Sequence, residues 1–295
     1  FLKVKKDYLN FLNKEKIFNK SKLAQIESLK KIYIPMSFWI EKKYRKKGKT
    51  LFLGLSGGQG SGKTTITGIL KIILEKFFKR EIQVSSIDDF YKTLKERNHM
   101  SYKIHNLFKT RGVPGTHDID LLKKFFNNLK KINLKKFKSP KFDKSNDDRF
   151  KKKYWNNIKR KPEIVILEGW CIGAKPQSNT LIKKPINILE KEEDTKLTWR
   201  KKVNNELKTN YKKIYNLLDK KIYLKVPNFR YVLKWRLLQE KKLRFKSKKK
   251  AMTNKQIKRF IMFYERLTKN MTKNYKKNDV IIFIDKGHKI KSIKF

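Results

Sequence analysis

The sequence has little cysteine, glycine or proline: its 295 residues include one Cys, 12 Gly and 7 Pro. The single cysteine, Cys171, excludes an internal disulfide and a zinc site built from several cysteines. No motif marks it as a nucleophile, so we expect a small buried residue. No apolar run approaches the roughly 20 residues that a membrane-spanning helix needs. The first residues are too charged for a signal peptide, which favours a cytoplasmic protein, and the missing initiator Met suggests a trimmed or internal start.

Acidic residues are also scarce. The chain has 26 Asp and Glu against 78 Lys and Arg, a formal net charge of +52, and 66 of the 78 are lysines. These lysines are spread along the whole chain and accompany abundant Asn, Ile and Phe, the composition that A/T-rich codons produce. A nucleic-acid-binding protein more often concentrates arginine on one face. We therefore expect attraction of small anionic substrates, no membrane partner and no specific nucleic-acid partner.

The apolar residues that are present suit a folded α/β chain. They make up 38% of the sequence, and aromatic residues 13%, enough for a buried core. Helical patterns, such as those at 63–78 and 256–267, separate short apolar runs, which predicts crossover connections and a parallel sheet. The loosely helical spacing near the start predicts a helical N-terminal extension (1–45) before the main domain (46–295). The five predicted strands are residues 50–56, 82–87, 164–167, 222–226 and 280–284.

A phosphate-binding loop follows the first predicted strand. Residues 57–64 match the pattern G-x-x-x-x-G-K-[ST] between an apolar strand and an apolar helix, as the motif requires. Glycines allow backbone N–H groups to converge on phosphate oxygens, at the positive end of the helix that follows. Lys63 is predicted to reach the β- and γ-phosphates, and the Thr64 hydroxyl to join the Mg²⁺ shell. The residues predicted to bind a nucleoside triphosphate are Gly57, Gly58, Gln59, Gly60, Ser61, Gly62, Lys63, Thr64 and Thr65.

Carboxylates follow two further predicted strands. Asp88 and Asp89 come after the second strand, and Glu168 after the third. Ligands of such sheets gather at the carboxyl ends of the strands. Asp88 could accept the proton of an attacking hydroxyl, and Glu168 could orient the Mg²⁺ shell. The alternatives are that the aspartates cap the next helix, or that Glu168 is a solvated acid.

Two polar segments lie between these strands. The turn RGVPGTHD (111–118) carries Arg, His and Asp together, and arginine offers a planar fork for a carboxylate or phosphate. The same turn could instead be a β-turn whose aspartate caps a helix, and both interpretations can hold together. The segment 142–149 (FDKSNDDR) forms a second polar cluster, with an exposed loop as its alternative.

Together, GLSGGQGSGKTT, SIDDFY, RGVPGTHD, FDKS…DDR and LEGWCIGAKPQ resemble the bacterial and plant-type D-glycerate 3-kinase family. Its members are P-loop kinases related to phosphoribulokinase, uridine kinase and pantothenate kinase. The resemblance covers roughly residues 32–275. It implies a three-layer α/β/α P-loop fold with a mainly parallel five-stranded sheet and a lid at about 236–253. Two departures are a shortened 145–149 segment and a lysine-rich lid without the usual glycine.

The resemblance also assigns roles. It places Asp88 at the catalytic base, Glu168 at the Walker-B-like acid and Arg236 at the lid arginine. The predicted catalytic residues are therefore Asp88, Arg236 and, from the phosphate loop, Lys63. The predicted substrate residues are Asp89, Tyr91, Arg111, His117, Asp118, Lys144 and Arg149.

The implied activity is ATP- and Mg²⁺-dependent transfer of a phosphoryl group to a small organic acid, with D-glycerate giving 3-phosphoglycerate. The alternatives are a P-loop kinase for another small alcohol or a nucleoside, a nucleotide-dependent switch, and a basic nucleic-acid-binding P-loop protein. The switch leaves Asp88 and Arg111 without a role.

Overall fold

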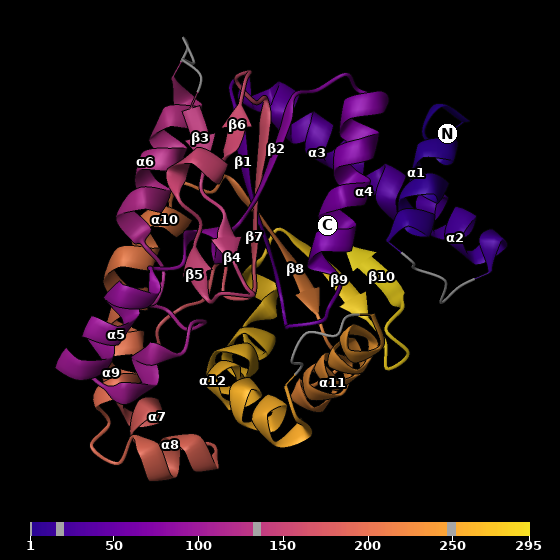
Figure 1. Ribbon diagram of the computed structural model, residues 1–295. Helices are drawn as coiled ribbons and strands as arrows, with labels where there is room; N and C mark the ends of the chain where they lie inside the picture. The colour runs from indigo at the N-terminus through magenta and orange to yellow at the C-terminus, as the bar shows by residue number, and fades with distance from the viewer. Residues whose placement is uncertain (1, 16–20, 132–136, 247–251) are drawn as a thin grey trace.

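A computed structural model describes residues 2–15, 21–131, 137–246 and 252–295, with the side chains of 242–246 excepted. A six-stranded sheet forms the middle layer, in the order β10-β9-β8-β1-β7-β2 (Figure 1). All neighbouring strands are parallel except β10, which pairs antiparallel with β9. The strands are β1 (Leu51–Gly57), β2 (Ile82–Ser86), β7 (Ile164–Gly169), β8 (Lys220–Lys225), β9 (Val280–Ile284) and β10 (Ile290–Lys294).

The predicted fold class and its mainly parallel sheet are confirmed. All five predicted strands are present, and β10 is an additional edge strand. Its sequence, IKSIK, holds two apolar residues and is largely exposed, so its pattern was too weak to predict a strand. Two small antiparallel pairs also occur: β3 (Phe137–Ser139) with β6 (Asn156–Ile158), and β4 (Phe142–Asp143) with β5 (Asp148–Arg149).

Helices cover both faces of the sheet (Figure 1). The helices are α1 (Leu2–Lys14), α2 (Lys22–Ser28), α3 (Ile34–Lys47), α4 (Lys63–Lys76), α5 (Leu94–Lys103), α6 (Ile119–Lys130), α7 (Asn179–Lys183), α8 (Ile188–Glu193), α9 (Thr198–Glu206), α10 (Lys212–Tyr215), α11 (Phe229–Lys246) and α12 (Asn254–Lys273). Short π-helical turns continue α2 into α3 (Leu29–Tyr33) and α9 into α10 (Leu207–Tyr211).

Two hydrophobic cores lie on opposite faces of the sheet, because successive strand side chains point to opposite sides. Leu53 and Leu55 of β1 pack with α1, α3 and α4 in one core. Phe52 of the same strand packs with α6, α9 and α12 in the other. The helical N-terminal segment therefore shares a core with the sheet. Within 236–253, the expected lid, residues 236–246 belong to α11, and 247–251 lie outside the described residues.

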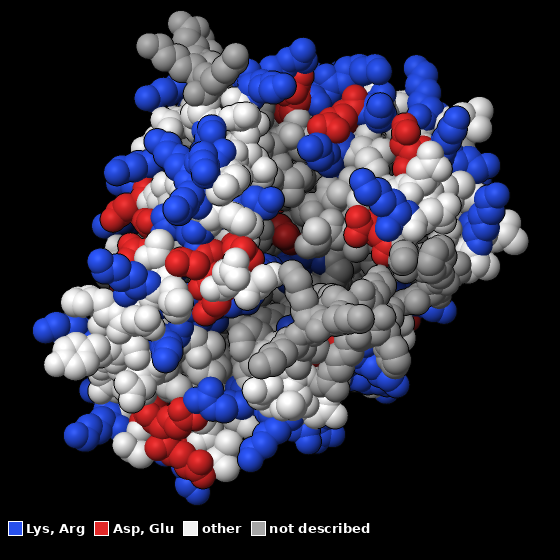
Figure 2. Space-filling view, in the orientation of Figure 1, with Lys and Arg blue, Asp and Glu red and all other residues white. Residues whose placement is uncertain are grey.

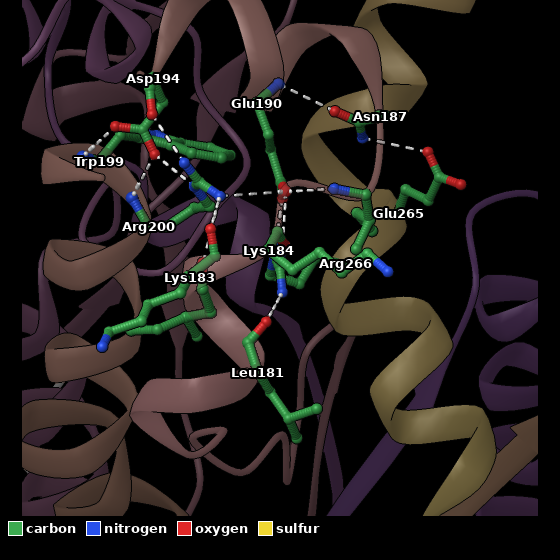
Figure 3. Close-up of polar contacts among 12 residues, drawn as sticks. Leu181, Lys183, Lys184, Asn187, Glu190, Asp194, Trp199, Arg200, Glu265 and Arg266 are labelled. Atoms are coloured by element: carbon green, nitrogen blue, oxygen red, sulfur yellow. Dashed lines mark hydrogen bonds and ion pairs between the residues drawn. The ribbon is translucent and has the colours of Figure 1, made fainter. Parts of the chain in front are cut away.

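Buried ion pairs hold the helices of the second face together (Figure 3). Arg200 of α9 donates to Asp194 (Nε–Oδ2 2.7 Å), and Arg266 of α12 donates to Glu190 of α8 (Nε–Oε1 2.7 Å). Both carboxylates are fully buried. Removing one partner of such a pair leaves an uncompensated buried charge, so these helices have a strongly preferred arrangement. That arrangement supports Tyr211 and Tyr264, which contact the polar turn described below.

Lysine and arginine are scattered over the molecule. On the face in Figure 2 they are distributed over the whole outline and interspersed with acidic residues, without one continuous basic tract. The same view shows a hollow near the middle of this face, beside the β4–β5 pair, with an acidic side chain visible at depth. Among the described residues, no helix is long and apolar enough to cross a membrane.

Candidate active site

The candidate site lies where three parallel strands end. β1 lies between β7 and β8, so the chain leaves β1 to build the sheet on both sides, and ligands bind at such switch points. In the register of the sheet, Glu168 of β7 is paired with Leu55 of β1 and with Ser86 of β2. The loop after β1 and Asp88, two residues beyond Ser86, therefore lie at the same edge as Glu168.

The loop after β1 has the backbone of a phosphate cradle. Gly60 and Gly62 have positive φ angles, 72° and 91°, which residues with a Cβ rarely adopt. A Cβ on Gly60 would also lie 3.1 Å from the Cβ of Trp235 in α11. α4 begins at Lys63, with Thr64 and Thr65 in its first turn, so its N-terminal amides point into the loop. Ser61 Oγ and Gln59 Oε1 are buried without a hydrogen-bond partner.

Lys63 folds over this loop. Its Nζ donates to the carbonyl oxygens of Gly57 (3.0 Å) and Gly58 (3.1 Å). Burial lowers the pKa of the ammonium, while the nearby carboxylates Glu168 and Asp88 act to raise it. The positive charge therefore lies between the cradle and both carboxylates.

Thr64 and Glu168 form a pair suited to a magnesium ion. The Thr64 hydroxyl donates to Glu168 Oε1 (3.1 Å), whereas Oε2 is buried and has no partner. Burial raises the pKa of Glu168, and Lys63 acts against this rise. The described residues contain no cluster of three or more His, Cys, Asp or Glu that could hold a metal alone. One hydroxyl and one carboxylate fit Mg²⁺, which keeps several waters and takes further oxygens from phosphates.

Asp88 faces this pair from the end of β2. It lies in a 3-10 turn (Ile87–Phe90), and Ser86, not Asp88, accepts the N–H bond that starts the turn. Its Oδ2 accepts a hydrogen bond from Lys144 Nζ (2.9 Å). Burial acts to raise the pKa of Asp88, but Lys144 and Lys63 outweigh it and hold the pKa below its ordinary value. The carboxylate is therefore ionised at neutral pH.

Asp89 points to a different neighbour. Its Oδ1 accepts a hydrogen bond from the Phe142 amide (3.3 Å), which ties the 3-10 turn after β2 to β4. Burial, with Asp88 nearby, raises the pKa of this carboxyl to about 6.

Asp89 should make stability fall between pH 4 and pH 6. A raised carboxyl pKa means that the folded state holds the proton more tightly than the unfolded chain, so the free energy of unfolding decreases as pH rises through this window. Asp89→Asn keeps the acceptor oxygen and cannot ionise. The free energy of unfolding of the variant, minus that of the wild type, should therefore increase by up to about 3 kcal/mol from pH 4 to pH 7. Urea unfolding at both pH values measures this gain, and an equal difference at the two pH values would contradict it.

His117, near the end of the turn 111–118, forms a buried stack with Tyr91. Their ring centroids are 4.4 Å apart, and both residues are at most 2% exposed. His117 Nδ1 lies 2.5 Å from the Tyr211 hydroxyl, which also accepts from the Gly115 amide, while Nε2 has no partner. Burial lowers the pKa of His117 to about 3, so the ring is neutral. The predicted contact of either residue with substrate stays a prediction.

Asp118 and Arg149 bind each other. Asp118 caps α6 by accepting from the Leu121 amide (2.9 Å), as the structural alternative predicted. Its Oδ2 accepts from Arg149 Nη1 (3.1 Å), and Arg149 Nε donates to the Tyr91 carbonyl oxygen (3.1 Å). These bonds fix the β4–β5 hairpin, residues 142–149, on the turn.

Arg111 lies beside the same hairpin. Its Nη1 donates to Asp147 Oδ1, and its guanidinium lies over the Phe142 ring, 5.4 Å from the centroid. Asp147 also binds Arg97, a fully buried residue of α5 that sequence reasoning missed. No spacing or motif marks a single arginine in a polar helix such as α5 as part of a site.

Arg236 of α11 stays close to the phosphate loop, since its backbone N would lie 3.7 Å from a Cβ on Gly60. Its guanidinium forms an ion pair with Glu240 (Nη2–Oε2 2.8 Å) and donates a hydrogen bond to Gln239 Oε1 (3.2 Å). Its role as a lid arginine stays a prediction. Cys171 is buried, and burial raises the pKa of its thiol to about 12, so a reactive thiolate is not favoured.

A glycine-rich phosphate loop at the junction of β1 and α4, with carboxylates at the ends of β7 and β2 on one side of it, defines a P-loop phosphotransferase. Comparison with known proteins agrees. The model of the phosphoribulokinase/uridine kinase family matches residues 52–204, and the chain belongs to that family. Kinase activity and the use of ATP follow from this membership.

Two curated relatives and one solved structure are similar over most of the chain. The uncharacterized kinase mug58 of Schizosaccharomyces pombe is 31% identical over 77% of this chain and 82% of its own length. The chloroplastic D-glycerate 3-kinase of Arabidopsis thaliana is 27% identical over 79% of this chain but 52% of its own length. The D-glycerate 3-kinase structure from Cryptococcus neoformans superposes with a TM-score of 0.77 at 22% identity, covering 89% of this chain and 98% of that one. At 22% identity, the match to the Cryptococcus neoformans structure shows that the two proteins share a fold.

Proposed function

We propose that this kinase transfers the γ-phosphoryl group of ATP to a hydroxyl of a small hydroxy acid, with D-glycerate giving 3-phosphoglycerate as the best candidate. The observation that carries the proposal is the β4–β5 hairpin, which contacts an ionised base and a guanidinium at once: Lys144 binds Asp88, and Asp147 binds Arg111. A hydroxyl to be activated and a carboxylate to be gripped are the two groups that a hydroxy acid offers. The plant relative named above, a D-glycerate 3-kinase, supports this substrate class.

The proposed step is an in-line displacement. The acceptor oxygen forms a bond to the γ-phosphorus, the bond to the β–γ bridging oxygen breaks, ADP leaves, and the hydroxyl proton passes to Asp88 Oδ. The loop amides and Lys63 stabilise charge on the phosphoryl oxygens. Mg²⁺ would be held by Thr64 and Glu168, and supplies further charge neutralisation when bound. Arg236 is proposed to reach the phosphates from α11.

Arg111 is the proposed carboxylate ligand, and Arg111→Lys tests it. An ammonium cannot reproduce the two parallel bonds of a guanidinium, so KM for D-glycerate should rise roughly tenfold or more while KM for ATP changes little. Arg259→Lys is the matched control, because Arg259 is an exposed arginine of α12 that pairs with Glu193. Steady-state kinetics with each substrate varied in turn measures both constants. An unchanged KM for D-glycerate in Arg111→Lys would contradict the assignment.

The alternative functions have less support among the residues that the structure describes. A nucleoside acceptor needs an aromatic slot with base-edge partners, and Tyr91 beside the turn is instead buried against His117. The basic nucleic-acid-binding alternative has in its favour the net charge alone, and that charge is dispersed on the face in Figure 2.

A further inference from the structure

A chain of three charged residues leads from a buried helix to the proposed carboxylate ligand. Arg97 of α5 is fully buried, and its Nη1 donates to Asp147 Oδ2 (3.1 Å). The other carboxylate oxygen of Asp147 accepts from Arg111 Nη1. Asp147 therefore stands between one arginine that no solvent reaches and one that is 24% exposed at the candidate site.

Arg97 holds Asp147 by both its side chain and its backbone. Besides the carboxylate contact, Arg97 Nη2 donates to the Asp147 carbonyl oxygen, and Arg97 Nη1 donates to the Lys109 carbonyl oxygen (2.7 Å). Asp147 has φ +54°, a left-handed conformation that aspartate and asparagine tolerate better than most residues. These contacts keep Asp147 in this conformation at the end of the hairpin turn.

Asp147 cannot readily leave this position. Its carboxylate is the one acidic group that contacts Arg97 within the described ranges 2–15, 21–131, 137–246 and 252–295. Moving it away would leave a buried guanidinium without a counter-charge, which is strongly destabilising. An incoming substrate carboxylate would therefore not displace Asp147, and Asp147 remains bound to Arg111 during turnover.

One nitrogen of the Arg111 guanidinium is therefore held by Asp147, and its other N–H groups are available to bind a ligand. One nitrogen, Nη1, is bound to Asp147, and across the part of the chain that the structure describes the guanidinium has no other polar partner. A guanidinium carries five N–H donors in one plane, so fixing one of them, over the Phe142 ring, also orients the others. Arg111 is close enough to the Asp88–Lys144 pair to act on the ammonium, whose pKa Asp88 raises and Arg111 lowers.

We propose that Asp147, held by buried Arg97, is a positioning residue that orients the Arg111 fork toward the carboxylate of the acceptor. This inference rests on the proposed function, since it assigns Arg111 to that carboxylate. Asp147 touches no reacting group itself. It acts on the affinity for acidic acceptors through the direction of the Arg111 side chain.

The test is Asp147→Asn, compared with Asp148→Asn. Asparagine suits the left-handed backbone and keeps an acceptor oxygen, but it removes the charge that binds both arginines. Asp148 lies one residue further along the hairpin and accepts from the amides of Leu94 (2.9 Å) and Arg149 (2.7 Å), so its variant makes the same change in charge without touching Arg111. Asp147→Glu is a second variant that keeps a carboxylate for Arg97 while displacing it by one methylene.

Asp147→Asn should unfold at a lower temperature than the wild type, because Arg97 loses its counter-charge. In the folded variant we expect KM for D-glycerate to rise roughly tenfold, with kcat and KM for ATP within about twofold of the wild type. The preference for D-glycerate over glycerol, measured as the ratio of kcat/KM, should fall by the same factor because glycerol lacks the carboxylate. Asp147→Glu should show a smaller rise in KM for D-glycerate and a smaller fall in this preference, and Asp148→Asn should match the wild type in both. Adding Asp147→Asn to Arg111→Lys should raise KM for D-glycerate little further, since either change alone already disrupts the same Arg111–carboxylate contact.

Three results would overturn the inference. One is an equal loss with D-glycerate and glycerol, which would indicate a general effect on the hairpin. Another is an equal rise in KM for D-glycerate in Asp147→Asn and Asp148→Asn. The third is a lower KM for D-glycerate in Asp147→Asn, which would make Asp147 a competitor of the substrate. In each of these cases wild-type turnover of D-glycerate leaves the proposed function intact, whereas absence of that turnover overturns both.

Discussion

Replacing Lys63 with methionine is expected to reduce phosphoryl transfer by about 10³-fold or more, because no other cation in the phosphate loop can neutralise charge on the transferred group. The variant should still fold. The bonds lost are those from Nζ to the Gly57 and Gly58 carbonyl oxygens, and methionine retains most of the aliphatic stem. Coupled detection of ADP release with saturating acceptor measures the rate, and thermal unfolding measures the fold.

Lys71→Met is the matched control for this loss. Lys71 lies on the same helix, α4, two turns from the loop, where it is 44% exposed and pairs with Glu75. Such an exposed pair contributes little to stability or function. If Lys63→Met kept near-normal turnover, or if both variants lost activity equally, the assignment of the phosphate cradle would be wrong.

Asp88→Asn should lower kcat by ~10²- to 10⁴-fold, the usual range for loss of a general base, with KM for ATP little changed. Asparagine keeps the size of the side chain and can still accept from Lys144, whose Nζ lies 2.9 Å from Oδ2, but it cannot take a proton. Asp120→Asn, the same change at an exposed position in the first turn of α6, serves as the control. The measurement is steady-state kinetics with ATP and acceptor varied in turn.

A different result would reassign Asp88. A mild effect on kcat combined with a large loss of ATP affinity would place the residue in the magnesium shell beside Glu168. The pKa of Asp88 lies below its ordinary value, because its two lysine neighbours outweigh burial. The base is consequently ionised at the pH of a neutral assay, and acid conditions should inactivate the enzyme by protonating it.

The main features of the fold could be predicted from contiguous patterns. The apolar runs at 50–56 and 164–167 contain most of β1 and most of β7, because a strand buried on both faces is largely apolar. The phosphate loop was predictable because its function depends on the backbone of eight consecutive residues. β10 was not predicted, since a half-exposed edge strand keeps too few apolar residues to show a period.

Site residues placed by the end of a strand could be predicted from the sequence. Site residues placed by the β4–β5 hairpin could not. Glu168 lies at the end of β7, and Asp88 lies two residues beyond the end of β2, so the parallel pairing of the two strands brings them together. The Lys144–Asp88 pair joins residues 56 positions apart, and the Arg97–Asp147 pair joins residues 50 apart. These contacts depend on the turn between β4 and β5 and on where α5 packs, and neither leaves a local pattern. His117 was predicted to face substrate, and its burial against Tyr91 arises from tertiary packing.

The most direct measurement of the central claim is an acceptor panel with purified protein, ATP and Mg²⁺. D-glycerate, L-glycerate, glycerol, uridine and pantothenate are each offered at equal concentration, ADP release is followed, and the products are identified by mass spectrometry. We predict that D-glycerate is phosphorylated fastest, that the product is 3-phosphoglycerate, and that uridine and pantothenate are poor acceptors. Faster phosphorylation of uridine or pantothenate would contradict the proposed substrate, and ADP release that no acceptor stimulates would contradict phosphoryl transfer to any of them.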